Sequence, residues 1–316
     1  MQPGLPLLAE FAAPRGWVGD RSLAGSFNSG MDHAVAAPPS PFDLVSPPMQ
    51  TAPLVFTSPH SGRLYPIEFI EAARLDAHGL RRSEDSFVDE LFGGVPAAGA
   101  PLLCATFPRA YCDPNREAWE LDPGMFADDL PAWVNTTSAR VGAGLGTLAR
   151  VVGSGEAIYR EKLPFSEAEF RVRNCWAPYH TMLAALITET QARFGACLLV
   201  DCHSMPAHAG RGSLPDIVLG DAHGTACSGR ITALVESVLT GMGYEVRRND
   251  PYAGGYITRH YGRPREGVHA LQIEVARSLY MDERQLLRRP GFAALQADLS
   301  VLTANLALAA PSLLTP

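Results

Sequence analysis

The fold is decided by the stretch ACLLVDCHS at residues 196–204. It opens with a continuous apolar run and ends in polar residues that include Asp201 and His203. A second stretch, PLVFTSPHSG at residues 53–62, has the same plan and ends in a turn that holds His60. Continuous apolar strands of this kind are typical of a parallel sheet that is covered on both faces. We therefore expect both strands in one buried sheet, with their two histidines forming two walls of one metal site.

A third apolar run, ALQIEVA at residues 270–276, carries the lone carboxylate of Glu274. Burying an ionisable group inside a strand is costly unless the group is paired or performs chemistry. Glu274 is therefore a candidate general base, which would take a proton from an attacking water and return it to a leaving amine. An ion pair with Arg277 or another arginine would explain the carboxylate equally well.

Segments that read as strands alternate with segments that read as helices from Leu54 onward. This order predicts an α/β fold with a mostly parallel sheet covered by helices on both faces, and ligands in such folds bind beyond the carboxyl ends of the strands. The expected strands are Leu54–Ser58, Leu102–Phe107, Cys197–Cys202, Ile217–Leu219, Tyr244–Arg247 and Val268–Val275. The expected helices are Phe87–Phe92, Ala139–Val152, Ser166–Arg193, Thr225–Leu239 and Arg284–Leu308. The third of these opens with a Ser-x-x-Glu capping box and stops at Gly195.

The amino-terminal segment differs in composition from the rest of the chain. Residues 1–50 are rich in Gly, Pro, Ser and Ala, which predicts a loosely ordered leader. Met31 within it is a second candidate for the start of the protein. The remaining residues, 51–316, are expected to form a single catalytic domain.

Composition excludes several classes of protein. Hydrophobic residues make up 47% of the chain and charged residues 19%, which indicates an ordered globular protein. A formal net charge of −7 argues against nucleic-acid binding, and no run approaches the roughly 20 apolar residues of a membrane span. The first residues lack the positive charge of a signal peptide, and the six cysteines include no Cys-x-x-Cys pair. We therefore expect a cytoplasmic protein with reduced thiols. The oligomeric state is left open.

Positive charge in this chain is almost entirely arginine, because Lys162 is the only lysine. The planar guanidinium fork of arginine suits carboxylates, which favours a small anionic substrate. The turn FPRAYCDPNRE at residues 107–117 holds Arg109, Asn115 and Arg116 between rigid prolines and is a candidate carboxylate-binding segment. A solvated surface loop would have the same composition.

The two histidines predict a catalytic zinc site, because such sites use three protein ligands, commonly two histidines and one carboxylate. We expect the carboxylate in the acidic turn SEDSFVDEL at residues 83–91, where Asp85 precedes a candidate helix cap. Glu84 is a close competitor, and both acids could instead stabilise the start of a helix. Asp201 lies on the same face of its strand as His203, two residues on, and would orient a ligand histidine, whereas Cys202 points to the other face.

A further loop, PYAGGYITRH at residues 251–260, combines paired glycines with aromatic residues. Such a segment would close over a substrate as a lid, or it would form an ordinary hairpin. The sequence leaves both alternatives open.

In combination, these motifs resemble the N-formylglutamate amidohydrolase (N-formylglutamate deformylase) family, which is similar to the zinc carboxypeptidases and aspartoacylases. The resemblance runs in order from Leu54 to Asp282 and rests on residues 58–62, 84–91, 108–117, 201–204 and 254–277. Two features depart from the related patterns. The position three residues after His60, where the carboxypeptidases have a metal-binding acid, is Arg63, and the acidic turn lacks the Asp-x-Asp-Trp pattern of typical deformylases.

The resemblance implies a central mixed sheet flanked by helices and one zinc ion, with other divalent metals as alternatives. The implied residues are His60, Asp85 (or Glu84) and His203 for the metal, Glu274 as the base, and Arg109, Asn115 and Arg116 for the substrate carboxylate. The implied reaction is hydrolysis of an N-formyl or N-acyl acidic amino acid, most simply N-formyl-L-glutamate to L-glutamate and formate in histidine degradation. The alternatives are a carboxypeptidase-like or other N-acyl-amino-acid hydrolase, and a non-catalytic metal- or ligand-binding relative.

Overall fold

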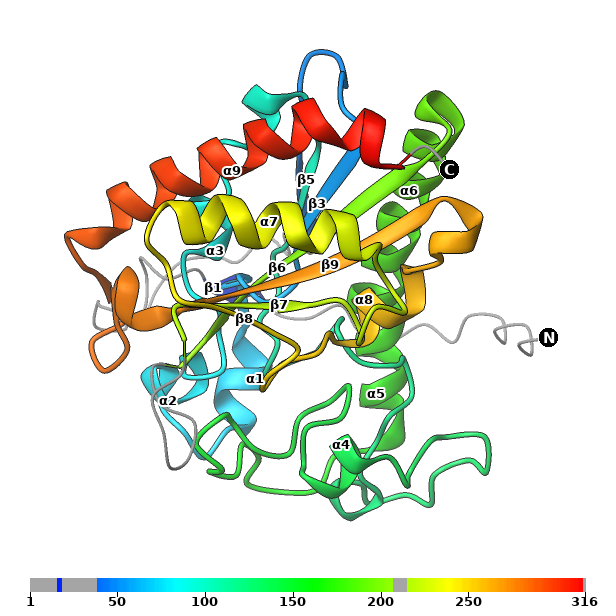
Figure 1. Cartoon of the computed structure of the whole chain (residues 1–316). Coiled ribbons are helices and arrows are strands. Elements are labelled where there is room, and N and C mark those ends of the chain that lie inside the picture. Colours follow the sequence, from blue (N-terminus) through cyan, green and yellow to red (C-terminus); the bar gives the residue numbers. More distant parts are fainter. Residues whose placement is uncertain (1–15, 19–38, 207–214, 315–316) are drawn as a thin grey trace.

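A computed structural model of the chain describes residues 16–18, 39–206 and 215–314. Most of the expected leader therefore lies outside the described residues. Seven strands form one sheet in the order β2-β5-β3-β6-β9-β7-β8 (Figure 1). The strands are β2 (Phe42–Val45), β3 (Leu54–Ser58), β5 (Leu102–Ala105), β6 (Cys197–Met205), β7 (Ile217–Gly220), β8 (Val246–Arg248) and β9 (Val268–Ala276).

The sheet is mixed and mostly parallel. The pairs β2–β5 and β7–β9 are antiparallel, and the other four neighbouring pairs are parallel. Two short antiparallel pairs lie outside it: β1 (Trp17–Val18) with β4 (Tyr65–Pro66), and β10 (Met281–Asp282) with β11 (Leu287–Arg288). The predicted α/β class and sheet type are confirmed.

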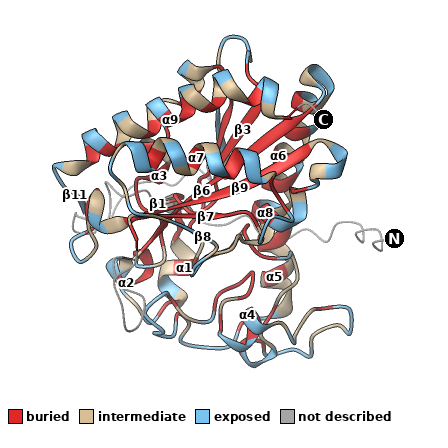
Figure 2. Cartoon of the chain, in the orientation of Figure 1, coloured by how far each residue is buried: buried red, intermediate tan, exposed pale blue. Residues whose placement is uncertain are grey.

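Helices cover both faces of the sheet (Figures 1 and 2). They are α1 (Ile67–Ala72), α2 (Ala77–Arg81), α3 (Val88–Leu91), α4 (Ala139–Gly142), α5 (Phe165–Arg171), α6 (Ala177–Phe194), α7 (Gly229–Gly241), α8 (Tyr256–Tyr261) and α9 (Gly291–Leu314). Helices α3, α7 and α9 contribute to one hydrophobic cluster, and α1 and α6 contribute to another.

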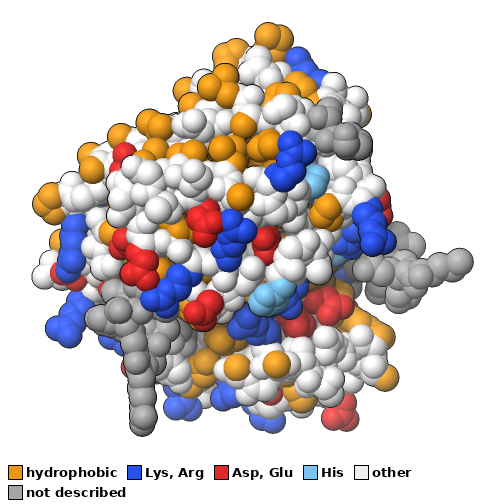
Figure 3. All heavy atoms as spheres, in the orientation of Figure 1, with side chains coloured by type: hydrophobic (Ala, Val, Ile, Leu, Met, Phe, Trp, Pro, Cys, Tyr) orange, Lys and Arg blue, Asp and Glu red, His pale blue; other side chains and the backbone are white. Residues whose placement is uncertain are grey.

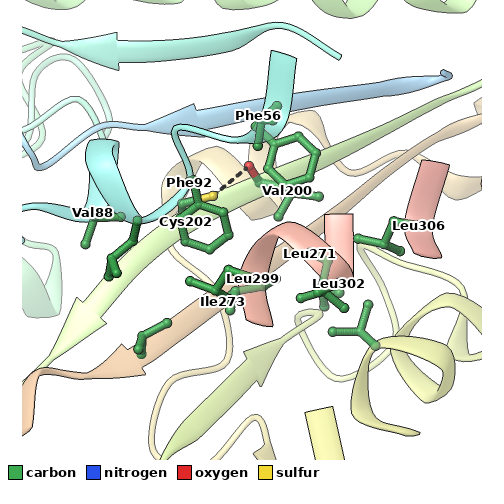
Figure 4. Packing of buried hydrophobic residues seen from close by; sticks show 14 of the residues in the cluster. Phe56, Val88, Phe92, Val200, Cys202, Leu271, Ile273, Leu299, Leu302 and Leu306 are labelled. Carbon is green, nitrogen blue, oxygen red and sulfur yellow. Dashed lines mark hydrogen bonds between the residues drawn. The ribbon is translucent and has the colours of Figure 1, made fainter. Parts of the chain in front are cut away.

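Strand alternation divides the side chains of the central strands between these two clusters. In β6, Val200 packs in the cluster with α9, whereas Leu199 packs in the cluster with α6. Figure 4 shows Val200, Cys202 and Ile273 in the first cluster, together with Leu299 and Leu302 of α9. Each such fully buried aliphatic side chain stabilises the fold by about 1.5–3 kcal/mol. The alternation also fixes which side chains of β6 and β9 face the functional site.

Strand β2 was not predicted from the sequence. It lies within residues 1–50, the expected leader, and Phe42 pairs with Ala105 at the edge of the sheet. The expectation missed it because four residues with prolines on both sides carry little periodic signal.

The helix expected over Ala139–Val152 is wrong beyond its first turn. Helix α4 ends at Gly142, and Gly144 adopts a left-handed conformation with φ of +74°. The carbonyl of Leu145 accepts a hydrogen bond from Arg116 Nε at 2.9 Å. The glycine-rich run therefore forms a turn that packs against the arginine-bearing segment 107–117.

The long helix expected over Ser166–Arg193 is confirmed as α5 and α6, joined by a π-helical turn at Val172–Trp176. Its expected capping box is wrong. The N–H of Phe165 donates instead to the carboxylate of Asp128 at 2.6 Å, so a residue distant in sequence satisfies the helix start. Gly195 ends the helix with φ of +81°, as expected.

Helix α9 begins seven residues later than its expected start at Arg284, because residues 281–288 form the β10–β11 pair. By length and composition alone α9 could cross a membrane, and 33% of its apolar window is buried. Its inward residues, including Leu299 and Leu302, belong to the hydrophobic cluster between the sheet and α9, as in the core helix of a globular protein. Val301 and Leu308 of α9 are exposed. Hydrophobic side chains gather over the upper part of the face drawn in Figure 3.

Candidate metal centre

The two histidines predicted as metal ligands lie at the same edge of the sheet. Strands β3 and β6 are parallel, and Thr57 is paired with Asp201. His60 follows β3 in a turn, whereas His203 belongs to the last part of β6. Their ring centroids are 4.7 Å apart, and each residue is 2% exposed. The parallel register therefore places two buried imidazoles beside each other.

Asp85 completes a group of three possible ligands. The N–H of Asp85 donates to the carbonyl of His60 at 3.0 Å, which fixes the acidic turn beneath the first histidine. Its Oδ2 lies 3.3 Å from His60 Nδ1 and 3.1 Å from His203 Nδ1. One atom from each of the three residues lies within 4.8 Å of the others, as a shared cation would require.

The competing acid, Glu84, belongs to a different network. Its carboxylate accepts hydrogen bonds from Tyr65 at 2.6 Å, Ser86 at 2.9 Å and Arg81 at 3.1 Å. Burial raises the pKa of Glu84, although these three partners act in the opposite direction. The geometry therefore favours Asp85 over Glu84 as a ligand.

A second layer of carboxylates holds the far side of each imidazole. His60 Nε2 lies 2.7 Å from Asp113 Oδ1, and His203 Nε2 lies 2.8 Å from Asp201 Oδ1. A carboxylate accepts a proton-bearing nitrogen, so these contacts assign the hydrogen to Nε2 and leave the Nδ1 lone pairs toward Asp85. Metal-binding histidines in proteins are commonly held by a carboxylate in this way.

The donor set fits a divalent cation. His60 Nδ1 is buried and has no hydrogen-bond partner in the described part of the chain, although it lies 3.3 Å from Asp85 Oδ2. Two neutral imidazole nitrogens and one carboxylate oxygen form a ligand set that zinc uses in catalytic sites. Although burial opposes ionisation of Asp85, its contacts with His203 and His60 and the charge of Arg277 hold its pKa well below the usual range. The carboxylate is thus ready to bind a cation.

Glu274 lies on the neighbouring strand, beside the three possible ligands. It is paired in register with His203 and is 7% exposed. Burial, reinforced by the negative charge of Asp85, raises its pKa to about 7. Its Oε1 accepts a hydrogen bond from Gln272 at 2.7 Å, and no arginine of the described residues forms an ion pair with it. An ion pair with Arg277 or another arginine, the alternative explanation for this buried carboxylate, is therefore not observed among the described residues.

Arg277 pairs with Asp85 instead. Its Nη2 lies 2.9 Å from Asp85 Oδ1, and its Nε donates to Ser204 Oγ at 3.1 Å. The guanidinium therefore holds the oxygen of Asp85 that does not face the histidines. Such a partner keeps a carboxylate in one orientation and limits it to a single oxygen toward a cation.

The three residues expected to bind the substrate carboxylate all line the same cleft as the histidines. Arg109 donates to Asp113 at 2.8 Å. Asn115 lies with its Nδ2 at 3.2 Å from His203 Nε2. Arg116 is 9% exposed, and its Nη1 donates to the carbonyl of Asn115. These three side chains therefore line the cleft and also contact other residues of the site.

The cleft has a volume of about 910 Å³, within the range of small-molecule sites. Among the described residues it is lined by seven arginines, but by only four carboxylates. It thus concentrates positive charge in a protein whose formal net charge is −7. A local excess of arginine suits an anionic ligand.

The glycine-containing segment 251–260 forms a wall of this cleft, and the hairpin interpretation is wrong because its second half forms α8. The N–H of Ile257 donates to Asn115 Oδ1 at 2.8 Å, and the N–H of Gly255 donates to Gln272 Oε1 at 2.7 Å. A Cβ on Gly255 would lie 2.3 Å from Asn115 Nδ2, so glycine permits this close approach.

The contacts of Asp113 and Gln272 in the site were not predicted from the sequence. Asp113 lies within the segment 107–117, which was singled out for its arginines. A buried histidine that binds a metal through one nitrogen needs a partner for the other nitrogen, and this need could have pointed to an acid. Asp113 was not recognised as that partner because it is 53 residues from His60 in sequence. Gln272 shares a strand face with Glu274, so strand alternation could have indicated it.

Comparison with known proteins agrees with this geometry. The family model of N-formylglutamate amidohydrolase matches residues 52–281, which is most of the chain. The chain belongs to this family. The family is one of hydrolases that act on amide C–N bonds, so the protein is an enzyme of that type.

Two curated relatives are N-formylglutamate deformylases. The protein from Pseudomonas aeruginosa is 33% identical over 239 residues, which cover 73% of this chain and 83% of the relative. The protein from Pseudomonas putida is 30% identical over 239 residues, with coverage of 74% and 83%.

Solved structures share the fold. The N-formylglutamate amidohydrolase from Ralstonia eutropha superposes with a TM-score of 0.81 at 39% identity, covering 85% of this chain and 98% of that protein. A gene product from Agrobacterium tumefaciens gives a TM-score of 0.61 at 18% identity, over 86% and 96% of the two chains, which shows a common fold alone.

Proposed function

We propose that this enzyme hydrolyses the formyl amide of N-formyl-L-glutamate to L-glutamate and formate, using one zinc ion held by His60, Asp85 and His203. The proposal rests on the close approach of ligand atoms from these three side chains, one of which, His60 Nδ1, has no hydrogen-bond partner among the described residues. The buried acid Glu274 lies beside them on the adjacent strand. The substrate is supported by the two curated relatives and by the arginine-rich cleft.

A bound zinc ion would supply Lewis acidity, which polarises a carbonyl group and makes water more acidic. Glu274 in its ionised form accepts the proton of the water that attacks the formyl carbon. It then donates that proton to the amide nitrogen as the C–N bond breaks, giving formate and the free amine. A pKa of about 7 suits a group that both accepts and donates a proton near neutral pH.

Arg109 and Arg116 bind the substrate through its carboxylate in this proposal, and Asn115 holds the wall against which the substrate lies. The two guanidinium groups share Asp113, with distances of 2.8 Å and 3.9 Å to its Oδ2, so they are oriented before substrate binds. Fixing the carboxylate aligns the formyl group with Glu274, which accelerates the reaction through orientation as well as affinity.

We also propose a cytoplasmic location and a role in histidine degradation. The location is supported by the six cysteines, all of which are free and buried, as in proteins of reducing compartments. The role follows from the resemblance of the sequence to deformylases.

The proposal is tested by measuring formate release from N-formyl-L-glutamate, with acetate and amino-acid release from N-acetyl-L-glutamate and a peptidyl glutamate as comparisons. We expect the formyl substrate to have the largest kcat/KM. Faster turnover of the peptide would indicate a carboxypeptidase-like enzyme instead. Metal binding without turnover of any member would indicate a non-catalytic relative.

A further inference from the structure

The arginines nearest the metal centre already have partners within the protein. Arg109 donates to Asp113, and Arg116 donates through Nε to the carbonyl of Leu145 and through Nη1 to the carbonyl of Asn115. Guanidinium groups without such partners would suit the second carboxylate of a substrate that has two.

Besides Arg82, three other arginines of the cleft lining are exposed: Arg140 on α4, Arg259 on α8 and Arg284 between β10 and β11. Of these, Arg140 and Arg259 belong to the segments that contact Asn115 and Arg116. Neither side chain has a hydrogen bond or an ion pair with any residue in the described part of the chain. Arg82 of the same cleft differs, because it pairs with Glu156 at 2.5 Å. Arg140 and Arg259 therefore carry free charge into the cleft.

The backbone fixes both positions relative to Arg116. The N–H of Leu145 donates to the carbonyl of Arg140 at 2.8 Å, and the carbonyl of Leu145 accepts from Arg116 Nε. Helix α8, which carries Arg259, is joined to Asn115 by the hydrogen bond from the N–H of Ile257. Both free arginines are thus anchored to the segment that carries Asn115 and Arg116.

The electrostatics of this part of the cleft also favour an anionic ligand. Burial lowers the pKa of Arg116, and the positive charges of Arg109 and Arg140 lower it further, against the carboxylates of Asp113 and Glu120. Like charges held together in a cleft attract an anionic group, because it relieves their repulsion.

We propose that Arg140 and Arg259 select substrates with an acidic side chain by binding the carboxylate remote from the scissile amide. Arg109 and Arg116 then bind the carboxylate adjacent to that amide. This inference rests on the proposed function and adds a specificity site to it. The ligand class is an N-acyl amino acid with two carboxylates, and the neutral amide analogue is discriminated against.

The test compares N-formyl-L-glutamate with N-formyl-L-glutamine, which has nearly the same shape but a neutral side chain. We expect the ratio of their kcat/KM values to fall about tenfold in Arg140→Gln and in Arg259→Gln, the equivalent of one charge-assisted hydrogen bond. The loss should appear in KM for the glutamate substrate, with turnover of the glutamine substrate unchanged. Arg230→Gln on α7 is the matched control, because this exposed arginine lies outside the cleft lining.

Charge reversal supplies a readout that loss of structure would not produce. The double variant of Arg140→Glu with Arg259→Glu should prefer N-formyl-L-lysine over N-formyl-L-glutamate. A ratio that stays within twofold of wild type in both single variants, or a double variant that still prefers glutamate, would overturn the proposal.

Calorimetric binding of L-glutamate and L-glutamine to the same variants separates this proposal from the proposed function. If wild type hydrolyses no formyl substrate, the function is wrong, yet a preference for L-glutamate that is lost in Arg140→Gln and Arg259→Gln still supports the specificity site. If wild type hydrolyses N-formyl-L-glutamate and the variants keep its selectivity, only the specificity site is wrong.

Discussion

The floor and the mouth of the cleft are built in opposite ways. At the floor, His60 and His203 are each 2% exposed, and carboxylates hold their outer nitrogens at 2.7 Å and 2.8 Å. At the mouth, Arg140 and Arg259 are exposed and have no side-chain partners among the described residues. The floor is thus organised before any ligand arrives, whereas the mouth carries charge that only a ligand can neutralise.

This difference separates chemistry from selection. A reaction that depends on placing a proton acceptor and a cation around one amide requires groups whose orientations are fixed in advance. Recognition of a flexible acidic side chain tolerates mobile arginines. Substitutions at the floor are therefore expected to reduce turnover strongly, and substitutions at the mouth to change substrate preference moderately.

The largest effect is expected for Glu274→Gln at the floor. The amide keeps the size of the side chain but cannot accept the proton, so kcat should fall about 10³-fold, within the usual contribution of general acid–base catalysis. Metal content should stay at the wild-type level, because Glu274 is not one of the proposed ligands. Glu283→Gln, which also removes a cleft carboxylate, is the control and should retain turnover. Full activity in Glu274→Gln would show that Glu274 is not the general base.

The next largest effect is expected when Asp113 or Asp201 is substituted, since these carboxylates contact Nε2 of the two histidines. Asp113→Asn and Asp201→Asn should weaken metal binding about 10- to 100-fold, because an amide orients imidazole less well and does not raise its basicity. Competition with a fluorescent zinc chelator measures the affinity. Asp122→Asn is the matched control, since it removes a carboxylate that pairs with Arg150 at 2.7 Å outside the cleft lining. Equal affinities in Asp113→Asn and this control would show that the second layer does not support the metal.

The smallest effect concerns the cost of keeping Glu274 buried. Its pKa in the folded protein is about 7, above the ordinary value of 4.5, so the folded state favours the protonated acid. The stability this provides is fully present below pH 4.5 and is lost as pH rises through 7. In metal-free protein, Glu274→Gln should therefore be more stable than wild type at pH 8, on the order of 2 kcal/mol, and the gap should narrow toward pH 5.

Urea unfolding of the metal-free proteins at the two pH values measures this difference. A gap that is independent of pH would mean that Glu274 is not strained by burial. Glu283→Gln again serves as the control.

The sequence was sufficient for the parts of the molecule that depend on local pattern. Apolar runs such as Leu54–Ser58 and Cys197–Cys202 predicted the central strands, because continuous burial leaves a readable pattern. The convergence of His60 and His203 followed from placing both at carboxyl ends of parallel strands. Strand alternation correctly separated Cys202, which packs against the helices, from Asp201 and His203, which face the site.

The remainder depended on tertiary contacts that leave no local signal. The contacts that favour Asp85 over Glu84 as a possible ligand are tertiary: Tyr65 and Arg81 hold Glu84, whereas the histidines face Asp85. Adjacent acids at the entry to a helix look alike in sequence. Only the direction of each side chain distinguishes them.

The failed helix after Gly142 has a similar cause. Arg116, from another segment, takes the carbonyl of Leu145 that a longer helix would have used. The N–H of the same Leu145 donates to the carbonyl of Arg140, which lines the cleft. The error in the predicted helix therefore concealed one of the two arginines to which we assign specificity.

The measurement that tests the account most directly is the metal content of the purified protein, in wild type and in three variants. The account predicts about one zinc ion per chain in wild type and in Glu274→Gln, and none in His60→Ala or His203→Ala after dialysis against a chelator. One tightly held ion per chain in either histidine variant, or full turnover by metal-free wild type, would contradict it.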